Sequence, residues 1–265
     1  MHGPCVVAEI RRQVRLTRLL LMVTSFLFCH ACQQASGPEP IRVAVAANFA
    51  ETLRELALRY EAETGQGLRI SVGSTGALFS QIEQGAPFDC FFAADVRRPR
   101  LLEQAALALP GSRQTYARGA LVLWSADPQL VDGLQVLRSE NAFQRLAIAN
   151  PTTAPYGLAA RQTLEALGLW EPLQERLVMG QSIGQTFQFV QSGAAELGLV
   201  AMAQLHGSAD GSRHPVPPDL HAPIEQQMVL LREDPAVWAF WTWILNDAGA
   251  RDVIHDFGYA TVPTL

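Results

Sequence analysis

Lysine is absent from this chain of 265 residues, and all 20 of its basic residues are arginine. The 25 acidic residues outnumber them, so the formal net charge is −5 at pH 7. An acidic chain lacks the basic face that nucleic-acid binding requires, and we therefore expect no nucleic-acid partner. A hydrophobic content of 49% excludes an intrinsically disordered chain and is enough for a sizeable core.

Sequence motifs of common enzymes are also missing. Around Ser74 the order Gly73-Ser74-Thr75-Gly76 is not a GxSxG motif, the chain has no Walker A or HExxH motif, and no GxGxxG follows a predicted strand. The histidines beyond the N-terminal region show no metal-ligand spacing; they are His206, His214, His221 and His255. These absences predict a protein that is not an enzyme. A serine hydrolase with Ser74 as its nucleophile remains the weaker alternative.

The N-terminal residues have the pattern of a secretory signal peptide. Four arginines between positions 11 and 18 precede an almost wholly apolar run at residues 19–28. Ten apolar residues are too few to span a bilayer. Cleavage after Ala31 would leave Cys32 as the first residue, as in bacterial lipoproteins, so we expect a signal peptide at 1–31 and a linker at 32–40. Cys32 is then the candidate lipidation site, and ordinary cleavage nearby is the alternative.

Export makes the remaining chain more acidic. The leader holds four arginines and one glutamate, so the rest carries a net charge of −8. Cys90 is its only cysteine besides Cys32, and it lies in the apolar run 88–94, where we expect a small buried core residue. We predict a periplasmic or extracytoplasmic location, with the membrane reached only through the lipid anchor.

The rest of the chain alternates short apolar runs, polar turns and helical patterns. The runs predict strands at 41–46, 68–73, 88–94, 121–125, 145–150, 176–179, 197–202 and 225–231. Strands that alternate with helices favour an α/β fold with mostly parallel sheets. Two such series predict two lobes, with crossings near 115–122 and 222–229. Lobe I would comprise 41–118 and 226–265, and lobe II 119–225.

The turns between strands and helices carry the chemistry. They are Asn48, Ser74-Thr75-Gly76, Tyr156-Gly157 and Ser182-Ile183-Gly184. In open α/β sheets such turns lie where ligands bind, and free N–H groups at helix N-termini attract anions. All of these residues are neutral, which suits a fully deprotonated dianion that only accepts hydrogen bonds.

Helix capping is the alternative explanation for the same turns. Serine, threonine and asparagine are common N-caps, and Asn48 followed by Glu51 resembles a capping box. Asp95 is similarly expected to cap a helix that begins at Val96. Only convergence of several turns on one point would distinguish binding from capping, and composition does not show convergence.

From residue 41 onward the chain closely resembles the molybdate-binding proteins of bacterial ABC importers. The matching segments are VAVAANFAETL (43–53), ISVGSTGALFSQIEQGAPFD (70–89), FFAAD (91–95), ALPGSRQTYARGALVLWS (108–125), IANPTTAPYG (148–157), GQSIGQT (180–186) and HDFGY (255–259). The resemblance implies the class II periplasmic-binding-protein fold, in which two α/β lobes are hinged by two crossover strands. It also implies molybdate or tungstate as the ligand, held by neutral hydrogen bonds.

The resemblance assigns an oxyanion site as well. The matching positions are Ala47, Asn48, Ser74, Thr75, Tyr156 and Ile183, of which Ala47 and Ile183 would contribute backbone N–H groups. The molybdenum would be held through its oxygens by Asn48, Thr75, Tyr156 and Ile183, with no direct cation ligand and no cofactor. A second branch of the family has its tyrosine at the position of Ala201, and we interpret Tyr156 as its replacement.

The function implied is capture of the oxyanion by hinge closure and delivery to the membrane permease of an ABC transporter, by a protein that we expect to be a monomer. Receptors for sulfate, thiosulfate or ferric ion share the architecture and remain alternatives. A ferric site needs several converging tyrosines, histidines or carboxylates, and the chain has only 4 tyrosines.

Overall fold

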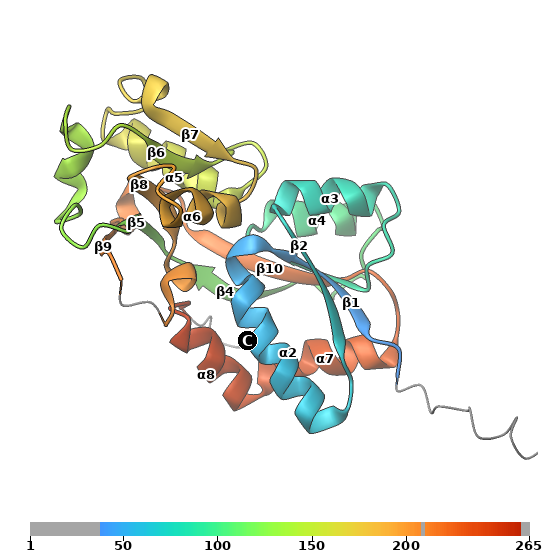
Figure 1. Ribbon diagram of the computed structural model, residues 1–265. Coiled ribbons are helices and arrows are strands. Elements are labelled where there is room, and N and C mark those ends of the chain that lie inside the picture. The colour runs from blue at the N-terminus through green and yellow to red at the C-terminus, as the bar shows by residue number, and fades with distance from the viewer. Residues whose placement is uncertain (1–37, 208–209, 261–265) are drawn as a thin grey trace, which may run out of the picture. The chain divides into compact units, whose positions relative to one another are not determined.

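Two five-stranded sheets organise the chain from Pro40 onward in the computed structural model, which describes residues 38–207 and 210–260. Residues 40–260 belong to one compact unit, and each of its sheets is the centre of one lobe (Figure 1). The predicted signal peptide and Cys32 lie outside the described residues. No helix in the described ranges combines the length and the apolar character that crossing a membrane demands.

The first lobe is built on the sheet of order β2-β1-β3-β10-β4. Its strands are β1 (Ile41–Ala46), β2 (Leu68–Gly73), β3 (Cys90–Ala93), β4 (Gln114–Gly119) and β10 (Ile224–Leu230). Three of these strands, β2, β1 and β3, are parallel, whereas β10 runs antiparallel to both of its neighbours. Helices α2 (Ala50–Thr64), α7 (Pro235–Asn246) and α8 (Ala248–Asp256) share one hydrophobic core, while α3 (Thr75–Glu83) and α4 (Arg97–Gln104) share another.

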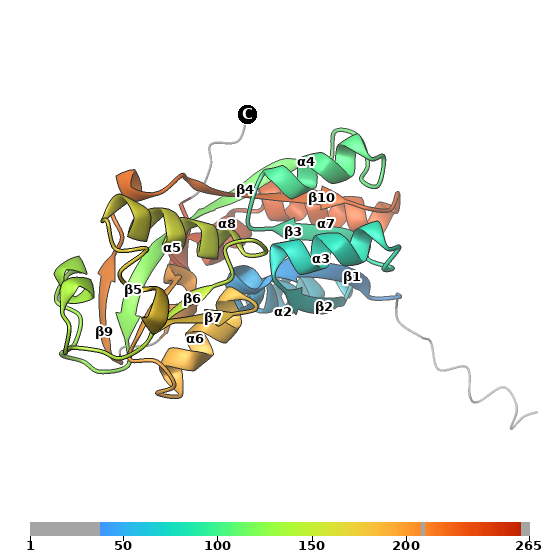
Figure 2. The ribbon, with the colours of Figure 1, turned by 90° about the horizontal axis from the view of Figure 1, so that it is seen from above.

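The second lobe repeats this plan with the order β7-β6-β8-β5-β9. Its strands are β5 (Leu121–Ser125), β6 (Leu146–Ala149), β7 (Leu177–Gly180), β8 (Leu197–Ala201) and β9 (Ser212–Pro215). Again β7, β6 and β8 are parallel and β5 is antiparallel to its neighbours. Helix α5 (Pro155–Ala166) packs with one core and α6 (Ile183–Gln191) with the other, so the two helices cover opposite faces of the sheet (Figure 2).

The chain crosses between the lobes twice. Ala120 alone separates β4 in the first sheet from β5 in the second. The return runs from β9 through residues 216–223 to β10, whose first residue, Ile224, pairs with Gly119. The two crossings therefore meet at one place, which is the geometry of a hinge.

The structure confirms the two-lobed α/β fold, with sheets that are more mixed than the expected mostly parallel ones because β10 and β5 return antiparallel. The predicted strands agree with the observed ones to within two residues at each end. The strands β4 and β9 were not predicted, since neither Gln114–Gly119 nor Ser212–Pro215 has an apolar alternation. Cys90 is buried and unpaired, as expected, and burial raises the pKa of its thiol.

The capping box expected at Asn48 is wrong. A 3₁₀ turn, η1 (Ala47–Phe49), comes before α2, and α2 has Phe49 at its N-cap with no side-chain cap. The Asn48 side chain is turned to Gln226 and Tyr259 instead, because both of its amide protons find acceptors there. The prediction for Asp95 is confirmed in part: its Oδ1 accepts the N–H of Arg98, the second residue of α4, at 2.9 Å, but α4 begins at Arg97 and its N-cap is Val96, which makes no side-chain cap.

A buried ion pair ties the first strand of the fold to the start of β3. Asp89 is 3% exposed and accepts the Arg42 backbone N–H at 2.8 Å and the Arg42 guanidinium at 2.7 and 3.1 Å. Burial by itself raises the pKa of the Asp89 carboxyl, but the hydrogen bonds and charge of Arg42, with the charge of Arg232, lower it below its ordinary value. The ionised form is therefore the one that stabilises the fold.

Replacing Asp89 by asparagine should lower the free energy of unfolding by about 2 kcal/mol at pH 7, since hydrogen bonds to a charged group are lost. A depressed carboxyl pKa contributes stability above the unfolded pKa and loses it as the pH falls through the folded pKa. The gap between the wild type and Asp89→Asn should thus close on acidification below about pH 4. Urea unfolding at pH 7 and pH 3 measures it, with Glu51→Gln, which removes an exposed ion pair with Arg54, as the control. A gap that stays constant with pH would contradict the assignment.

Candidate functional site

The predicted turns converge on one small cavity between the lobes. It is lined by Ala46, Ala47, Asn48, Ser74, Thr75, Ala94, Ala154, Pro155, Tyr156 and Ile183, which include all six predicted site residues. Its volume is about 10 Å³, roughly the space of one water molecule. The first six residues come from the first lobe and the last four from the second, so both lobes are needed to form the cavity.

Two hydroxyl groups of the cavity come from the start of α3. Ser74 is the N-cap, and its Oγ accepts the Ala77 N–H at 3.4 Å. Thr75 is 1% exposed, and its Oγ1 accepts the Ala94 N–H at 3.1 Å. Each oxygen accepts from the backbone, so each hydroxyl proton remains to be donated elsewhere. Capping and donation toward the cavity are therefore compatible.

Tyr156 supplies the phenol of the site. It is the second residue of α5, is 1% exposed, and its hydroxyl oxygen accepts a hydrogen bond from Gln226 Nε2 at 3.2 Å. Burial raises the pKa of the phenol well above its ordinary value, and the nearby Tyr259 raises it further. The hydroxyl thus keeps its proton at any physiological pH and can donate it.

Backbone N–H groups complete the set of donors. Ile183 is the first residue of α6, and Ala47 and Asn48 begin η1. The first N–H groups of a helix have no acceptor within that helix, and the helix dipole places positive partial charge there. Ser182 caps α6 by accepting the Gln185 N–H at 3.3 Å, so the N–H of Ile183 stays available to the cavity.

The side-chain amide of Asn48 does not donate to the cavity, because both of its protons are used elsewhere. Its Nδ2 donates to Gln226 Oε1 at 2.8 Å and to the Tyr259 hydroxyl at 3.0 Å, which uses both amide protons. The donor that Asn48 can offer to the cavity is therefore its backbone N–H. The side chain instead fixes the turn against two buried neighbours.

Within the described part of the chain, no residue that lines the cavity is charged. The cation that lies beside the α3 start is Arg98, which is paired with Asp95 and donates to the Thr152 carbonyl at 2.8 Å. The described residues also contain no group of three or more histidine, cysteine or carboxylate side chains placed to hold a metal ion. The site is thus built to satisfy an acceptor with neutral donors.

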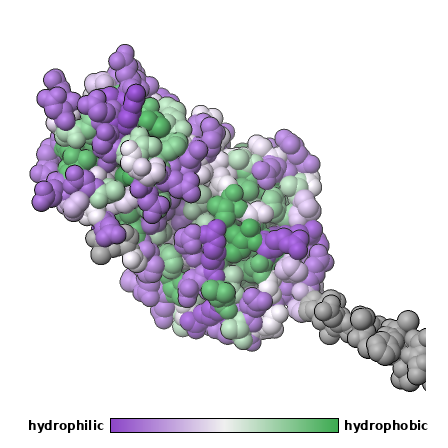
Figure 3. All heavy atoms as spheres, in the orientation of Figure 1, coloured by the Kyte–Doolittle hydropathy of each residue, from purple (hydrophilic) through white to green (hydrophobic). Residues whose placement is uncertain are grey.

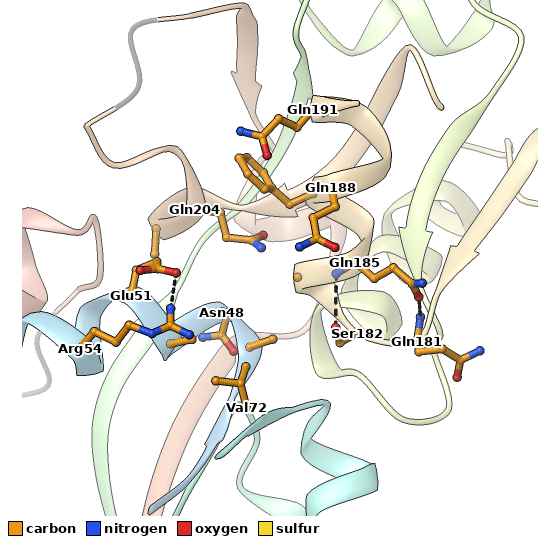
Figure 4. A pocket seen from close by; sticks show the side chains of 15 residues that line it. Asn48, Glu51, Arg54, Val72, Gln181, Ser182, Gln185, Gln188, Gln191 and Gln204 are labelled. Carbon is orange, nitrogen blue, oxygen red and sulfur yellow. Dashed lines mark hydrogen bonds and ion pairs between the residues drawn. The ribbon is translucent and has the colours of Figure 1, made fainter. Parts of the chain in front are cut away.

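A wider cleft of about 580 Å³ opens next to the cavity and shares Ala47 and Asn48 with it. Figure 4 shows Gln185 and Gln188 of α6 on one side of this cleft and Asn48 and Arg54 on the other. On the face drawn in Figure 3 the second lobe is mostly hydrophilic, and hydrophobic residues gather over β2, where Val72 is 44% exposed. The cleft is lined mostly by neutral residues, and its charged residues, Glu51 and Arg54, form an ion pair, so a small ion can reach the lobe boundary along it.

Sequence reasoning missed the residues that support this site from behind. Gln226 is fully buried and contacts Asn48, Tyr116 and Tyr156. The signal that could have found it is the polar run Glu225-Gln226-Gln227 inside an otherwise apolar strand, because buried polar groups need partners. Gly119 was also missed; a Cβ there would lie 1.9 Å from the Tyr156 hydroxyl.

Two hinged lobes that share a buried set of neutral donors define a solute-binding protein of the class II periplasmic type. The comparisons agree: the model of the family described as bacterial extracellular solute-binding protein matches residues 41–260. This chain belongs to that family, and within it to the molybdate-binding ModA proteins.

Two relatives and one solved structure support this assignment. The molybdate-binding protein ModA of Azotobacter vinelandii is 44% identical over 250 residues, which cover 92% of this chain and 97% of that protein. ModA of Rhodobacter capsulatus is 42% identical over 222 residues, covering 82% and 87%. The solved structure of the Azotobacter vinelandii periplasmic molybdate-binding protein superposes with a TM-score of 0.81 at 42% identity, over 84% of this chain and 100% of that one. Families of this kind are extracytoplasmic transport receptors.

Proposed function

We propose that this protein captures molybdate or tungstate between its lobes and delivers it to the membrane permease of an ABC transporter. The observation that carries the proposal is the single cavity lined by Ala47, Asn48, Ser74, Thr75, Tyr156 and Ile183. Hydroxyl and backbone donors from two lobes suit a tetrahedral dianion, and the close relatives are molybdate-binding proteins.

Neutral donors suffice for a dianion when several helix ends meet. Each helix N-terminus contributes about 0.3–1 kcal/mol of attraction, and up to ~2 kcal/mol in a buried site. The starts of η1, α3, α5 and α6 all reach the cavity. An unpaired cation would in contrast be costly to bury. The net charge of −8 on the exported chain is a mild hindrance to the approach of an anion, and it does not help binding.

The mechanism follows from the burial of the site. Asn48, Thr75, Tyr156 and Ile183 are each 3% exposed or less, so the lobes must separate before an ion can reach them. A tetrahedral oxyanion is larger than the cavity of about 10 Å³, and the surrounding walls must also widen around it. Closure then brings the donors of the second lobe onto an ion first held by the first lobe, and expels water.

Selectivity has two sources in this scheme. Sulfate shares the charge and shape of molybdate, so discrimination rests on the size of the closed cavity. Phosphate keeps a proton at neutral pH, and a site of donors offers that proton no acceptor.

Calorimetric titration of the purified protein with molybdate, tungstate and sulfate tests the proposal. We expect tight one-to-one binding of molybdate and tungstate and much weaker binding of sulfate. Equal or tighter binding of sulfate would replace the proposal by a sulfate- or thiosulfate-type receptor. Absence of binding to all three ions would reject it.

Replacing Tyr156 by phenylalanine should weaken molybdate binding by about tenfold, the lower end of the value of one hydrogen bond to a charged group. The ring stays in place, so the lobes should still close. The same titration measures the effect, and Tyr60→Phe, on α2 and away from the cavity, is the matched control. An unchanged affinity would show that the Tyr156 hydroxyl does not contact the ion.

Further properties belong to the same proposal. We propose that the protein is a monomer without catalytic activity or cofactor, and that acylation of Cys32 anchors it to the membrane after removal of residues 1–31. The linker would be 32–40, lobe I 41–118 and 226–265, and lobe II 119–225. In the first sheet β4 ends at Gly119 and β10 begins at Ile224, each within two residues of these proposed bounds.

A further inference from the structure

Gln226 occupies an unusual position on the return strand β10. Its side chain is fully buried, and the pairing of β10 with β4 shifts register between Gln226 and Gln227. The residue thus stands at an irregularity of the crossover strand, beside the hinge and directly behind the anion cavity. A buried amide at such a place needs partners for both its oxygen and its nitrogen.

The contacts around Gln226 support one assignment of hydrogen-bond directions. The Tyr259 hydroxyl donates its single proton to the Asn48 carbonyl at 2.8 Å, so its oxygen must accept from Asn48 Nδ2 at 3.0 Å. The nitrogen of Asn48 therefore also faces Gln226, whose Oε1 accepts from it at 2.8 Å. Tyr116 donates to the same Oε1 at 3.0 Å, which is the shorter of its two contacts, the other being with the Ala93 carbonyl at 3.3 Å.

This series of hydrogen bonds ends at Tyr156, which lines the cavity. With Gln226 Oε1 occupied by two donors, Gln226 Nε2 faces Tyr156 and donates to its hydroxyl oxygen at 3.2 Å. The Tyr156 oxygen then acts as an acceptor, and its own proton is directed elsewhere. Tyr156 lines the cavity, so the cavity is where that proton can be used.

We propose that Gln226 is a positioning residue that sets the direction of the Tyr156 proton, aiming it at the bound oxyanion. Gln226 does not line the cavity and acts through Tyr156. Because Asn48 and Tyr116 belong to the first lobe and Tyr156 to the second, the same amide also joins the two lobes when the donors are assembled. The inference rests on the proposed function and specifies how one of its donors is oriented.

The groups that face Gln226 determine what a substitution of its amide should do. They are the phenols of Tyr116, Tyr156 and Tyr259 and the amide of Asn48, and burial keeps the three phenols protonated by raising their pKa. A carboxylate in place of the amide would accept from Tyr156 instead of donating to it. The phenol proton would then turn away from the cavity.

The test is a double-variant cycle measured by calorimetric titration with molybdate. Gln226→Glu should weaken binding by about 100-fold and Tyr156→Phe by about tenfold, as expected for lost hydrogen bonds to a charged ion. In the Tyr156→Phe background Gln226→Glu should cost only about tenfold, because no phenol proton is left to redirect. Gln227→Glu, which adds the same charge one residue along, beside Arg113, should bind within about threefold of wild type.

Thermal unfolding of each variant shows whether it folds, and if Gln226→Glu does not, the cycle is run with the neutral Gln226→Met. Equal losses from the Gln226 change in both backgrounds would overturn the inference and leave only a structural or charge effect. Binding of Gln226→Glu within about threefold of wild type would overturn it as well. Failure of the wild type to bind molybdate or tungstate would instead reject the proposed function, on which the inference depends.

Discussion

Gly119→Ala should weaken molybdate binding by about 100-fold or more, the largest loss that we expect from a single methyl group in this protein. A Cβ at residue 119 would lie 1.9 Å from the Tyr156 hydroxyl and 2.7 Å from Gln226 Nε2. Tyr156 is buried, so its ring has little space to move away from β4. The hydroxyl would be driven toward the small cavity and take up space that the ion needs.

Calorimetric titration measures this loss, and circular dichroism with thermal unfolding verifies that both lobes are folded. Gly67→Ala is the control, because a Cβ there would meet only the end of the Glu61 side chain, at 3.4 Å. Its affinity should equal that of the wild type. An affinity of Gly119→Ala within about threefold of wild type would mean that Tyr156 has no fixed place in the site.

Ile183→Pro should also weaken binding by about 100-fold, because it deletes one backbone N–H donor aimed at a charged ion. Proline is suited to this place, since residue 183 is the first of α6 and proline is favoured at the first position of a helix. The preceding Ser182 has φ −145° and ψ 166°, the extended conformation that a following proline requires. The helix should therefore form as before.

The matched control is Ile183→Ala, which removes most of the side chain but keeps the N–H. Both variants lose core packing, since Ile183 is 3% exposed, and both should be less stable by about 2–4 kcal/mol. Only the proline variant should bind molybdate about 100-fold more weakly than the wild type. Equal affinities for the two variants would exclude the Ile183 N–H as a donor.

The strands and the site turns could be predicted because their causes are local. The apolar runs of β1, β5 and β8 show themselves directly in the sequence, and the turns that follow the parallel strands must meet at one edge of a sheet. The resemblance to molybdate-binding proteins then selected the six residues. All six line one cavity, and their contact with the ion stays a prediction.

What could not be predicted depends on partners far away in the chain. Strand β9 has little apolar character, and it forms because β5 offers it an edge. Asn48 was interpreted as a helix cap because its neighbours in sequence fit that role. The partners of its side chain, Gln226 and Tyr259, are 178 and 211 residues away in the sequence, so the residues around Asn48 cannot predict them.

Two hydrogen bonds join the lobes directly, without a ligand between them. The N–H of Gly76 at the start of α3 donates to the Thr153 carbonyl at 2.8 Å, and next to it Arg98 reaches the Thr152 carbonyl. These hydrogen bonds stabilise the closed conformation by themselves, so binding of the ion does not have to supply all of the free energy of closure. Under the proposed function, release of the ion would require both hydrogen bonds to break. A transporter that displaces the Thr152-Thr153 segment would thus open the lobes without competing for the hydrogen bonds of the ion.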